Sequence, residues 1–262
     1  MHQSFSIRSW VFAVCAIGVC GCGRNDAVRP DAATGLVRAF VAASTQDAVG
    51  DLAKEFARDT GIEVKVNPGA SNTLANQIVN GAEADVFLSA NEQWADSVKD
   101  NGFAAEIRLL LTNGLVIVVP KGNPAGIKRP EDLSGAKIEH VALAGENVPA
   151  GIYAKQALGA GHVYDELERD KKIVRGKDVR ATLNLVELGE VSAGVVYSTD
   201  AAMSNRVETV YSFDEKSHDP IRYPLVLLKH GQQNPAARKW FDYLGSAAAV
   251  KVFEKYGFRA LK

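Results

Sequence analysis

The chain has 262 residues, of which 47% are apolar and 23% are charged. This composition is typical of a globular protein with one large or two small domains. The net charge is −1, from 30 basic and 31 acidic residues. Nucleic acid is not an expected partner, because phosphate-backbone binding needs clustered Lys and Arg, and no basic run of five or more occurs. An anionic ligand would therefore be held by local geometry.

The N-terminus differs in composition from the rest of the chain. An apolar run at residues 10–19 follows Arg8, and it is too short to span a bilayer, which takes about 20 apolar residues. Such a run is typical of the core of a secretory signal peptide. We therefore expect residues 1–21 to be a signal peptide, and a buried N-terminal helix is the alternative.

All three cysteines, Cys15, Cys20 and Cys22, lie in or just after this run. The remaining chain has no cysteine and hence no disulfide, thiolate metal site or cysteine nucleophile. The sequence Val19-Cys20-Gly21-Cys22 resembles a bacterial lipobox, which predicts a lipid on Cys22 and a flexible tether over residues 22–34. Cleavage and release is the alternative. In both cases the protein works in the periplasm or outside the cytoplasmic membrane.

Beyond the tether, the hydrophobic pattern alternates between strands and helices. Strands are expected at residues 36–42, 62–66 and 85–89, and helices at 44–59, 74–80 and 91–99. This alternation predicts a parallel sheet with helices on its faces.

A second series of the same kind follows. It has expected strands at residues 115–119, 139–144, 193–197 and 207–211, with helices at 150–158 and 178–188. A strand at 223–228 and helices at 235–244 and 247–256 complete the chain. We predict an α/β protein with one lobe at 35–113 plus 222–262 and a second lobe at 114–221.

Motifs that would indicate catalysis are absent from the sequence. It contains no G-x-S-x-G, no P-loop and no H-E-x-x-H, and the five histidines are scattered. We expect a protein that is not an enzyme and has no cofactor. A serine hydrolase with Ser44 as nucleophile is the alternative from another class, but no motif places a base near Ser44. A receptor domain without a transport role is a third class.

Several expected helices begin at the same edge of their sheets, after a strand or a loop. The residues at these helix starts are Ser44, Ser71, Ala150 and Val179. Ligands of open α/β sheets bind at the carboxyl ends of the strands, and helix N-termini there present unpaired N–H groups and a partial positive charge. These positions suit an anion.

Each of these positions also has a simpler interpretation. Ser44, with Asp47 three residues later, resembles a capping box, and Ser71 can be a plain helix cap. Tyr197, at the end of an expected strand, is more commonly a core residue than a ligand contact.

A resemblance to a known family changes this balance. The sequence is similar to the periplasmic molybdate-binding protein family in several stretches that follow the family order over nearly the whole chain after the tether. These stretches are Phe40-Val-Ala-Ala-Ser-Thr, Ala70-Ser-Asn-Thr-Leu-Ala-Asn-Gln-Ile, Gly81-Ala-Glu-Ala-Asp-Val-Phe-Leu-Ser-Ala, Asn147-Val-Pro-Ala-Gly-Ile-Tyr-Ala-Lys-Gln-Ala-Leu, Asp178-Val-Arg, Gly194-Val-Val-Tyr and Tyr256-Gly-Phe.

The resemblance implies a type II periplasmic-binding fold, in which two lobes with mixed sheets flanked by helices are joined by two hinge strands. It also implies capture of molybdate, or of tungstate, for the membrane permease of an ABC importer, with molybdenum bound only as the oxyanion. The implied contacts are the hydroxyl and amide groups of Ser44 and Ser71, the amides of Ala150 and Val179, and the hydroxyl of Tyr197. Sulfate is the alternative ligand.

The sequence departs from the family pattern in three places. Thr45 follows Ser44 where the family often has Leu, the serine-rich run before the second helix is Ala70-Ser-Asn-Thr, and a small insertion falls at residues 159–161. These departures leave the class of ligand intact and concern only the selectivity among anions of that class. Arg180 stands next to Val179, and we expect it to be structural or to face the transporter.

Overall fold

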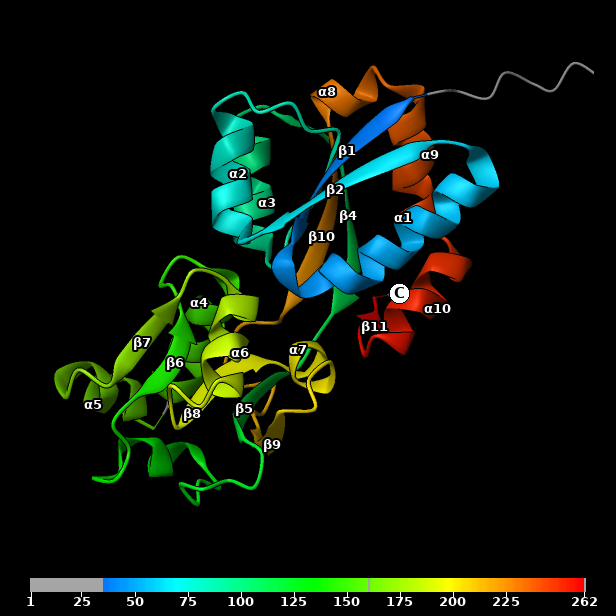
Figure 1. Cartoon of the computed structure of the whole chain (residues 1–262). Helices are drawn as coiled ribbons and strands as arrows, with labels where there is room; N and C mark the ends of the chain where they lie inside the picture. Colours follow the sequence, from blue (N-terminus) through cyan, green and yellow to red (C-terminus); the bar gives the residue numbers. More distant parts are fainter. Residues whose placement is uncertain (1–34, 160, 262) are drawn as a thin grey trace, which may run out of the picture. The chain divides into compact units, whose positions relative to one another are not determined.

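The computed structural model describes residues 35–159 and 161–261. The predicted signal peptide, Cys22 and the tether lie outside them. The described chain forms two mixed sheets, with strand orders β11-β4-β10-β3-β1-β2 and β7-β6-β8-β5-β9 (Figure 1). The predicted α/β class with sheets flanked by helices is confirmed.

The first sheet begins with the predicted parallel unit. Its strands are β1 (Leu36–Ala42), β2 (Glu63–Gly69), β3 (Val86–Leu88), β4 (Ala104–Thr112), β10 (Arg222–Leu228) and β11 (Arg259–Ala260). Strand β1 pairs in parallel with β2 and β3, whereas β10 runs antiparallel between β3 and β4. The chain therefore returns to this sheet after forming the second one.

Helices cover both faces of the first sheet (Figure 1). They are α1 (Gln46–Thr60), preceded by the 3-10 turn η1 (Ala43–Thr45), and α2 (Ser71–Val79), α3 (Glu92–Asp100), α8 (Lys229–Gln232), α9 (Pro235–Leu244) and α10 (Ala247–Lys255). Successive residues of a strand point to opposite faces. Val37, Ala39 and Val41 accordingly pack into the core beneath α1 and α9, and Phe40 packs into the core beneath α2 and α3.

The second sheet has the same organisation on a smaller scale. Its strands are β5 (Leu115–Pro120), β6 (Val141–Ala144), β7 (Ile173–Gly176), β8 (Ala193–Tyr197) and β9 (Val207–Ser212). Its helices are η2 (Pro130–Ser134), α4 (Pro149–Gly159), α5 (Val163–Arg169), α6 (Val179–Glu187) and α7 (Ser198–Ala202). Strand β6 is parallel to β7 and β8, and β5 is antiparallel to β8 and β9.

Besides the two-residue strand β11, sequence patterns missed two strands, β4 and β7. In β4 the charged residues Glu106 and Arg108 interrupt the apolar run, because they belong to a surface ion-pair group with Asp242 and Arg238. Strand β7 contains only four residues, none of its first three being fully buried. Neither strand therefore has a clear period of two, which is the pattern on which the sequence-based expectation rested.

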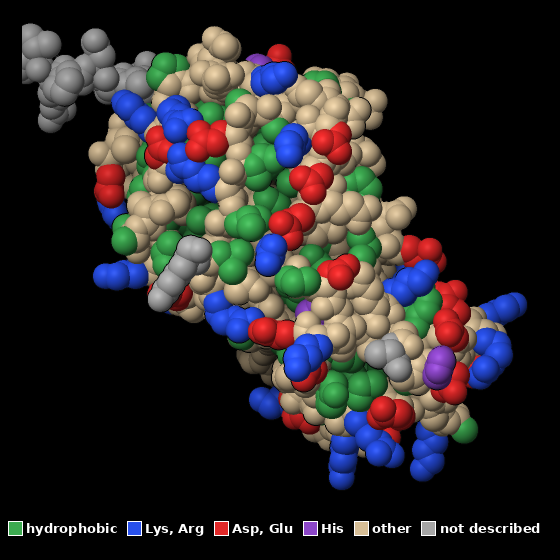
Figure 2. Space-filling view, turned by 180° about the vertical axis from the view of Figure 1, so that it is seen from behind, with side chains coloured by type: hydrophobic (Ala, Val, Ile, Leu, Met, Phe, Trp, Pro, Cys, Tyr) green, Lys and Arg blue, Asp and Glu red, His purple; other side chains and the backbone are tan. Residues whose placement is uncertain are grey.

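None of the helices in the described part of the chain is long and apolar enough to cross a membrane. Acidic and basic side chains are interspersed on the face seen in Figure 2, in agreement with the net charge of −1. A bound anion must therefore be held by groups close to it.

Candidate functional site

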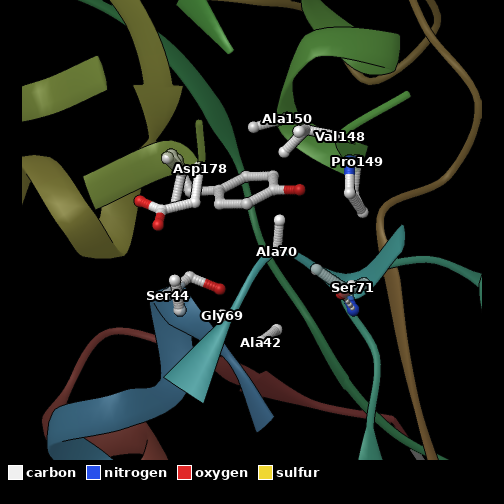
Figure 3. A pocket seen from close by; sticks show the side chains of 13 residues that line it. Ala42, Ser44, Gly69, Ala70, Ser71, Val148, Pro149, Ala150 and Asp178 are labelled. Carbon is white, nitrogen blue, oxygen red and sulfur yellow. Dashed lines mark hydrogen bonds between the residues drawn. The ribbon is translucent and has the colours of Figure 1, made fainter. Parts of the chain in front are cut away.

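A pocket of about 210 Å³, including its open mouth, is lined by residues of both sheets and their helices. All five residues named from the sequence line it: Ser44, Ser71, Ala150, Val179 and Tyr197. None is more than 4% exposed. In Figure 3, Ser44 and Ser71 face Ala150 and Asp178 across the cavity.

Four chain segments turn into helices at this pocket. Ser44 lies in η1 directly after β1, and Ser71 is the first residue of α2 after β2. On the opposite wall, Ala150 lies in the first turn of α4 and Val179 is the first residue of α6. The first N–H groups of a helix have no partner within it, so these segments direct backbone donors and partial positive charge into the pocket.

The backbone amide of Val179 is free to bind a ligand. Its neighbour Asp178 is the N-cap of α6 and accepts a hydrogen bond from the Ala181 N–H at 2.8 Å. Among the described residues, no hydrogen bond involves the Val179 N–H itself. Asp178 is thus engaged at the start of its helix, and this bond satisfies one oxygen of a carboxylate that lines the pocket.

Neither serine caps its helix, contrary to the simpler interpretation of the sequence. Helix α1 begins after Thr45 and α2 after Ala70, in both cases without a side-chain cap. The Ser44 hydroxyl lies instead 3.1 Å from the Tyr223 hydroxyl. The Ser71 Oγ accepts a bond of 3.0 Å from the backbone N–H of Ala90, so its own hydrogen remains available to the pocket.

The capping-box interpretation of Asp47 is also wrong. Its carboxylate lies 2.6 Å from Arg180 on α6, and so joins α1 beneath the first sheet to a helix of the second. Arg180 is in turn 2.6 Å from the fully buried Asp200 on α7. Burial raises the pKa of Asp200 to about 7 against the opposing charge of Arg180. Arg180 thus has a structural role, as expected: its guanidinium lies between two carboxylates, one from a helix of each sheet.

Tyr197 has the feature that most clearly points to a ligand. Its side chain is 1% exposed, and its hydroxyl has no hydrogen-bond partner among the described residues. Burial raises the pKa of Tyr197 well above its usual value, so the hydroxyl keeps its hydrogen. An unpaired buried hydroxyl costs about 1–3 kcal/mol, and an acceptor in the pocket would remove that cost.

Groups for other kinds of chemistry do not converge here. Within residues 35–159 and 161–261, no cluster of three His, Cys, Asp or Glu side chains could hold a metal ion. No histidine, lysine or arginine is among the residues that line the pocket. The donors are therefore hydroxyl and amide groups, and the one carboxylate that lines the pocket, Asp178, is the N-cap of α6 and makes no hydrogen bond to Ser44 among the described residues.

A pocket between two α/β sheets, surrounded by helix N-termini, is the arrangement of a solute-binding protein. The chain belongs to the bacterial extracellular solute-binding protein family, whose model matches residues 37–259. The two-lobed type II periplasmic-binding fold expected from the sequence is confirmed by similarity to a periplasmic molybdate-binding protein of Azotobacter vinelandii, with a TM-score of 0.76, 23% identity, and coverage of 86% of this chain and all of that one.

Two curated relatives resemble the chain over most of their length. One is the molybdate-binding protein ModA of Haemophilus influenzae, 39% identical over 87% of this chain and 92% of that protein. The other is YvgL of Bacillus subtilis, 39% identical over 92% of this chain and 93% of that protein. YvgL is provisionally named an ABC transporter substrate-binding lipoprotein. These relatives confirm the family resemblance stated from the sequence.

Proposed function

We propose that this protein captures molybdate or tungstate in the pocket and delivers it to the membrane permease of an ABC importer. The observation that carries the proposal is the unpartnered, buried Tyr197 hydroxyl in a pocket whose other polar side chains are the hydroxyls of Ser44 and Ser71 and the carboxylate of Asp178, which caps α6. A fully ionised tetrahedral oxyanion has only acceptors and can satisfy all of the hydroxyl and amide donors. The names and functions of the relatives support the same ligand.

In this proposal the anion accepts from five residues. Ser44 and Ser71 each contribute a hydroxyl and an amide, Ala150 and Val179 contribute amides, and Tyr197 contributes its hydroxyl. Each hydrogen bond to a charged group contributes roughly 1.5–3 kcal/mol. Because helices hold the amides in place, little conformational entropy is lost in binding. The protein needs no positively charged side chain in the pocket and no cofactor.

The lobes proposed from the sequence, 35–113 with 222–262 and 114–221, would close over this anion. Contacts that span the pocket favour the closed arrangement: Arg180 with Asp47, and the Trp94 Nε1–H donating to the Asn147 carbonyl at 3.0 Å. An anion that accepts from Ser44 and Ser71 on one wall and from Val179 on the other would add to them.

We propose that the protein binds its ligand and catalyses no reaction. A hydrolase would need a base beside Ser44, whereas the hydrogen-bond partner of that hydroxyl is a tyrosine. Burial raises the pKa of Tyr223 far above neutrality, so this tyrosine is a poor base.

We further propose that a lipid on Cys22 anchors the protein outside the cytoplasmic membrane. The lipobox-like sequence and the lipoprotein name of the relative YvgL support this anchor. Mass spectrometry of the membrane-extracted protein should find a lipidated N-terminal Cys22. A mature form that begins downstream of Cys22 would contradict the anchor while leaving export intact.

Calorimetry of the desalted protein against molybdate, tungstate, sulfate and phosphate tests the ligand. We expect molybdate and tungstate to bind more tightly than sulfate, because a smaller ion cannot reach all donors together. Phosphate near neutral pH carries a proton, and the one carboxylate that lines the pocket, Asp178, is engaged as the N-cap of α6; an unpaired proton would cost about 1–3 kcal/mol, so phosphate should be rejected. Displacement of molybdate by phosphate at comparable concentration would contradict a site that offers only donors to the anion, and no binding of any oxyanion would contradict the function.

A further inference from the structure

The hydroxyl of Ser44 can serve the pocket in two ways, depending on its bond with Tyr223. The two oxygens are 3.1 Å apart, and either can be the donor. If Ser44 donates to Tyr223, its hydrogen is not available to the ligand. If Tyr223 donates to Ser44, the serine hydrogen is free to point into the pocket. The role of Ser44 therefore depends on the direction of one hydrogen bond.

The amide of Asn113, between β4 and β5, fixes that direction from outside the pocket. The backbone N–H of Gly114 can only donate, and it bonds to Asn113 Oδ1 at 2.9 Å. The Ser198 hydroxyl donates to the same oxygen at 3.0 Å. Asn113 Nδ2 must then be the atom that faces Tyr223, at 3.1 Å, and Thr199, at 2.8 Å. Both amide hydrogens are thereby used.

The orientation of Asn113 determines what Tyr223 does. Because Nδ2 donates to it, the Tyr223 oxygen is an acceptor toward Asn113. The Tyr197 ring packs edge-on against Tyr223, but the Tyr197 hydroxyl is not within hydrogen-bonding geometry of any described residue. The remaining partner for the Tyr223 hydrogen among the described residues is therefore Ser44. Tyr223 is fully buried, so an unpaired hydroxyl hydrogen would cost about 1–3 kcal/mol. Burial also raises the pKa of Tyr223, so that hydrogen is present at physiological pH.

We propose that Asn113 and Tyr223 are positioning residues that hold Ser44 as a hydrogen-bond donor toward the pocket, and that they thereby select fully ionised oxyanions over protonated ones. This inference rests on the proposed function. The chain of donors runs from Asn113 through Tyr223 and Ser44 to the anion. It links the ligand to β10 and to the turn between β4 and β5, where the chain passes from the first sheet to the second.

Ser71 is also held as a hydrogen-bond donor toward the pocket, but by a backbone group and not by a side chain. Its oxygen accepts from the Ala90 backbone N–H, which no side-chain substitution removes. The two serines therefore differ in a way that can be tested: the donor direction of Ser44 depends on a side chain 179 residues away, and that of Ser71 does not.

The test is the substitution Tyr223→Phe, measured by calorimetry with molybdate and with phosphate. Without the tyrosine hydroxyl, the Ser44 hydroxyl can rotate and accept from a protonated anion. We expect molybdate affinity to fall about tenfold and the molybdate-to-phosphate affinity ratio to fall at least as much, from the loss of one oriented bond. Tyr256→Phe removes a hydroxyl that donates to Asp51 at 2.6 Å, outside the pocket, and should change neither value.

A double-mutant cycle distinguishes positioning from general structural damage. In the Ser44→Ala background, Tyr223→Phe should have almost no further effect on either anion, because its effect passes through Ser44. As a second variant, Asn113→Asp replaces the donor toward Tyr223 by an acceptor. The carboxylate would accept a hydrogen bond from Tyr223, and Tyr223 would then accept one from Ser44. Ser44 would no longer be held as a donor toward the pocket, so the molybdate-to-phosphate affinity ratio should fall. Thermal unfolding of each variant checks that it is folded.

Each outcome bears on one of the two proposals. Equal losses from Tyr223→Phe in the wild-type and Ser44→Ala backgrounds would make Tyr223 a structural residue and overturn the inference alone. An unchanged affinity ratio in both Tyr223→Phe and Asn113→Asp would do the same. A wild-type protein that binds no oxyanion would overturn the proposed function and this inference with it.

Discussion

The substitution Val179→Pro tests a backbone contact that side-chain truncation cannot reach. Val179 is the first residue of α6, and its N–H makes no hydrogen bond among the described residues. Proline is favoured at this helix position, because its missing N–H would be unpaired there. Asp178 before it is extended, with φ −154° and ψ 178°, which a following proline tolerates. The substitution therefore removes one proposed donor and keeps the helix.

The expected loss follows from that single bond. A hydrogen bond to a charged group contributes about 1.5–3 kcal/mol, which corresponds to a roughly 10- to 150-fold weaker affinity for molybdate. The Asp178 cap on Ala181 remains, so the free energy of unfolding without ligand should change by less than about 1 kcal/mol. Calorimetry measures the first quantity and denaturant unfolding the second.

A matched control exists at the start of α10. Ala247 is also a first helical residue after an extended N-cap, Ser246, and lies outside the pocket. Ala247→Pro should leave molybdate affinity unchanged. If Val179→Pro bound molybdate as tightly as the wild type, the amide of Val179 would not be a ligand donor. If both prolines weakened binding equally, the effect would come from the helices and not from the lost amide.

Three further predictions concern side chains around the pocket. Ser44→Ala and Ser71→Ala should each weaken molybdate binding about 10- to 100-fold and lower stability by about 1–3 kcal/mol, because each leaves a buried partner, the Tyr223 hydroxyl or the Ala90 N–H, without its hydrogen bond; unchanged affinity in both would remove them from the site. Arg180→Gln leaves the buried Asp200 without its cation; Asp200 should then take up a proton, and the lost ion pair should cost about 1–3 kcal/mol in denaturant unfolding, whereas Asp47→Asn, at a partly exposed partner, should cost less than about 1 kcal/mol; equal losses would contradict this assignment. The pKa of Asp200 is raised from 3.8 to about 7 by burial, so the folded state keeps a proton that the unfolded state loses; its stabilising effect is complete below pH 3.8 and is lost as the pH rises through 7. The melting temperature of Asp200→Asn should therefore fall less than that of the wild type between about pH 5 and 8, and parallel curves would refute the raised pKa.

The local patterns of the sequence were sufficient for the α/β class and for most elements. Helix α9 lies at the predicted residues 235–244, and α1 has its apolar residues Val49, Leu52 and Phe56 at helical spacing, all buried. Such spacing is visible in sequence because one face of each element must be buried. The five candidate site residues came from helix starts and from the family resemblance, and the structure places them all around one pocket.

Only the tertiary structure decided how these residues are supported. Ser44 and Tyr223 are 179 residues apart, and Asp47 and Arg180 are 133 apart. Sequence spacing indicates neighbours along a helix or strand, but not which distant side chains a fold brings together. Ser44 therefore looked like a helix cap, and Asp47 like its partner, until β10 placed Tyr223 and α6 placed Arg180 beside them. Packing between elements, which local periodicity does not encode, turned these apparent caps into a donor chain and an ion pair across the pocket.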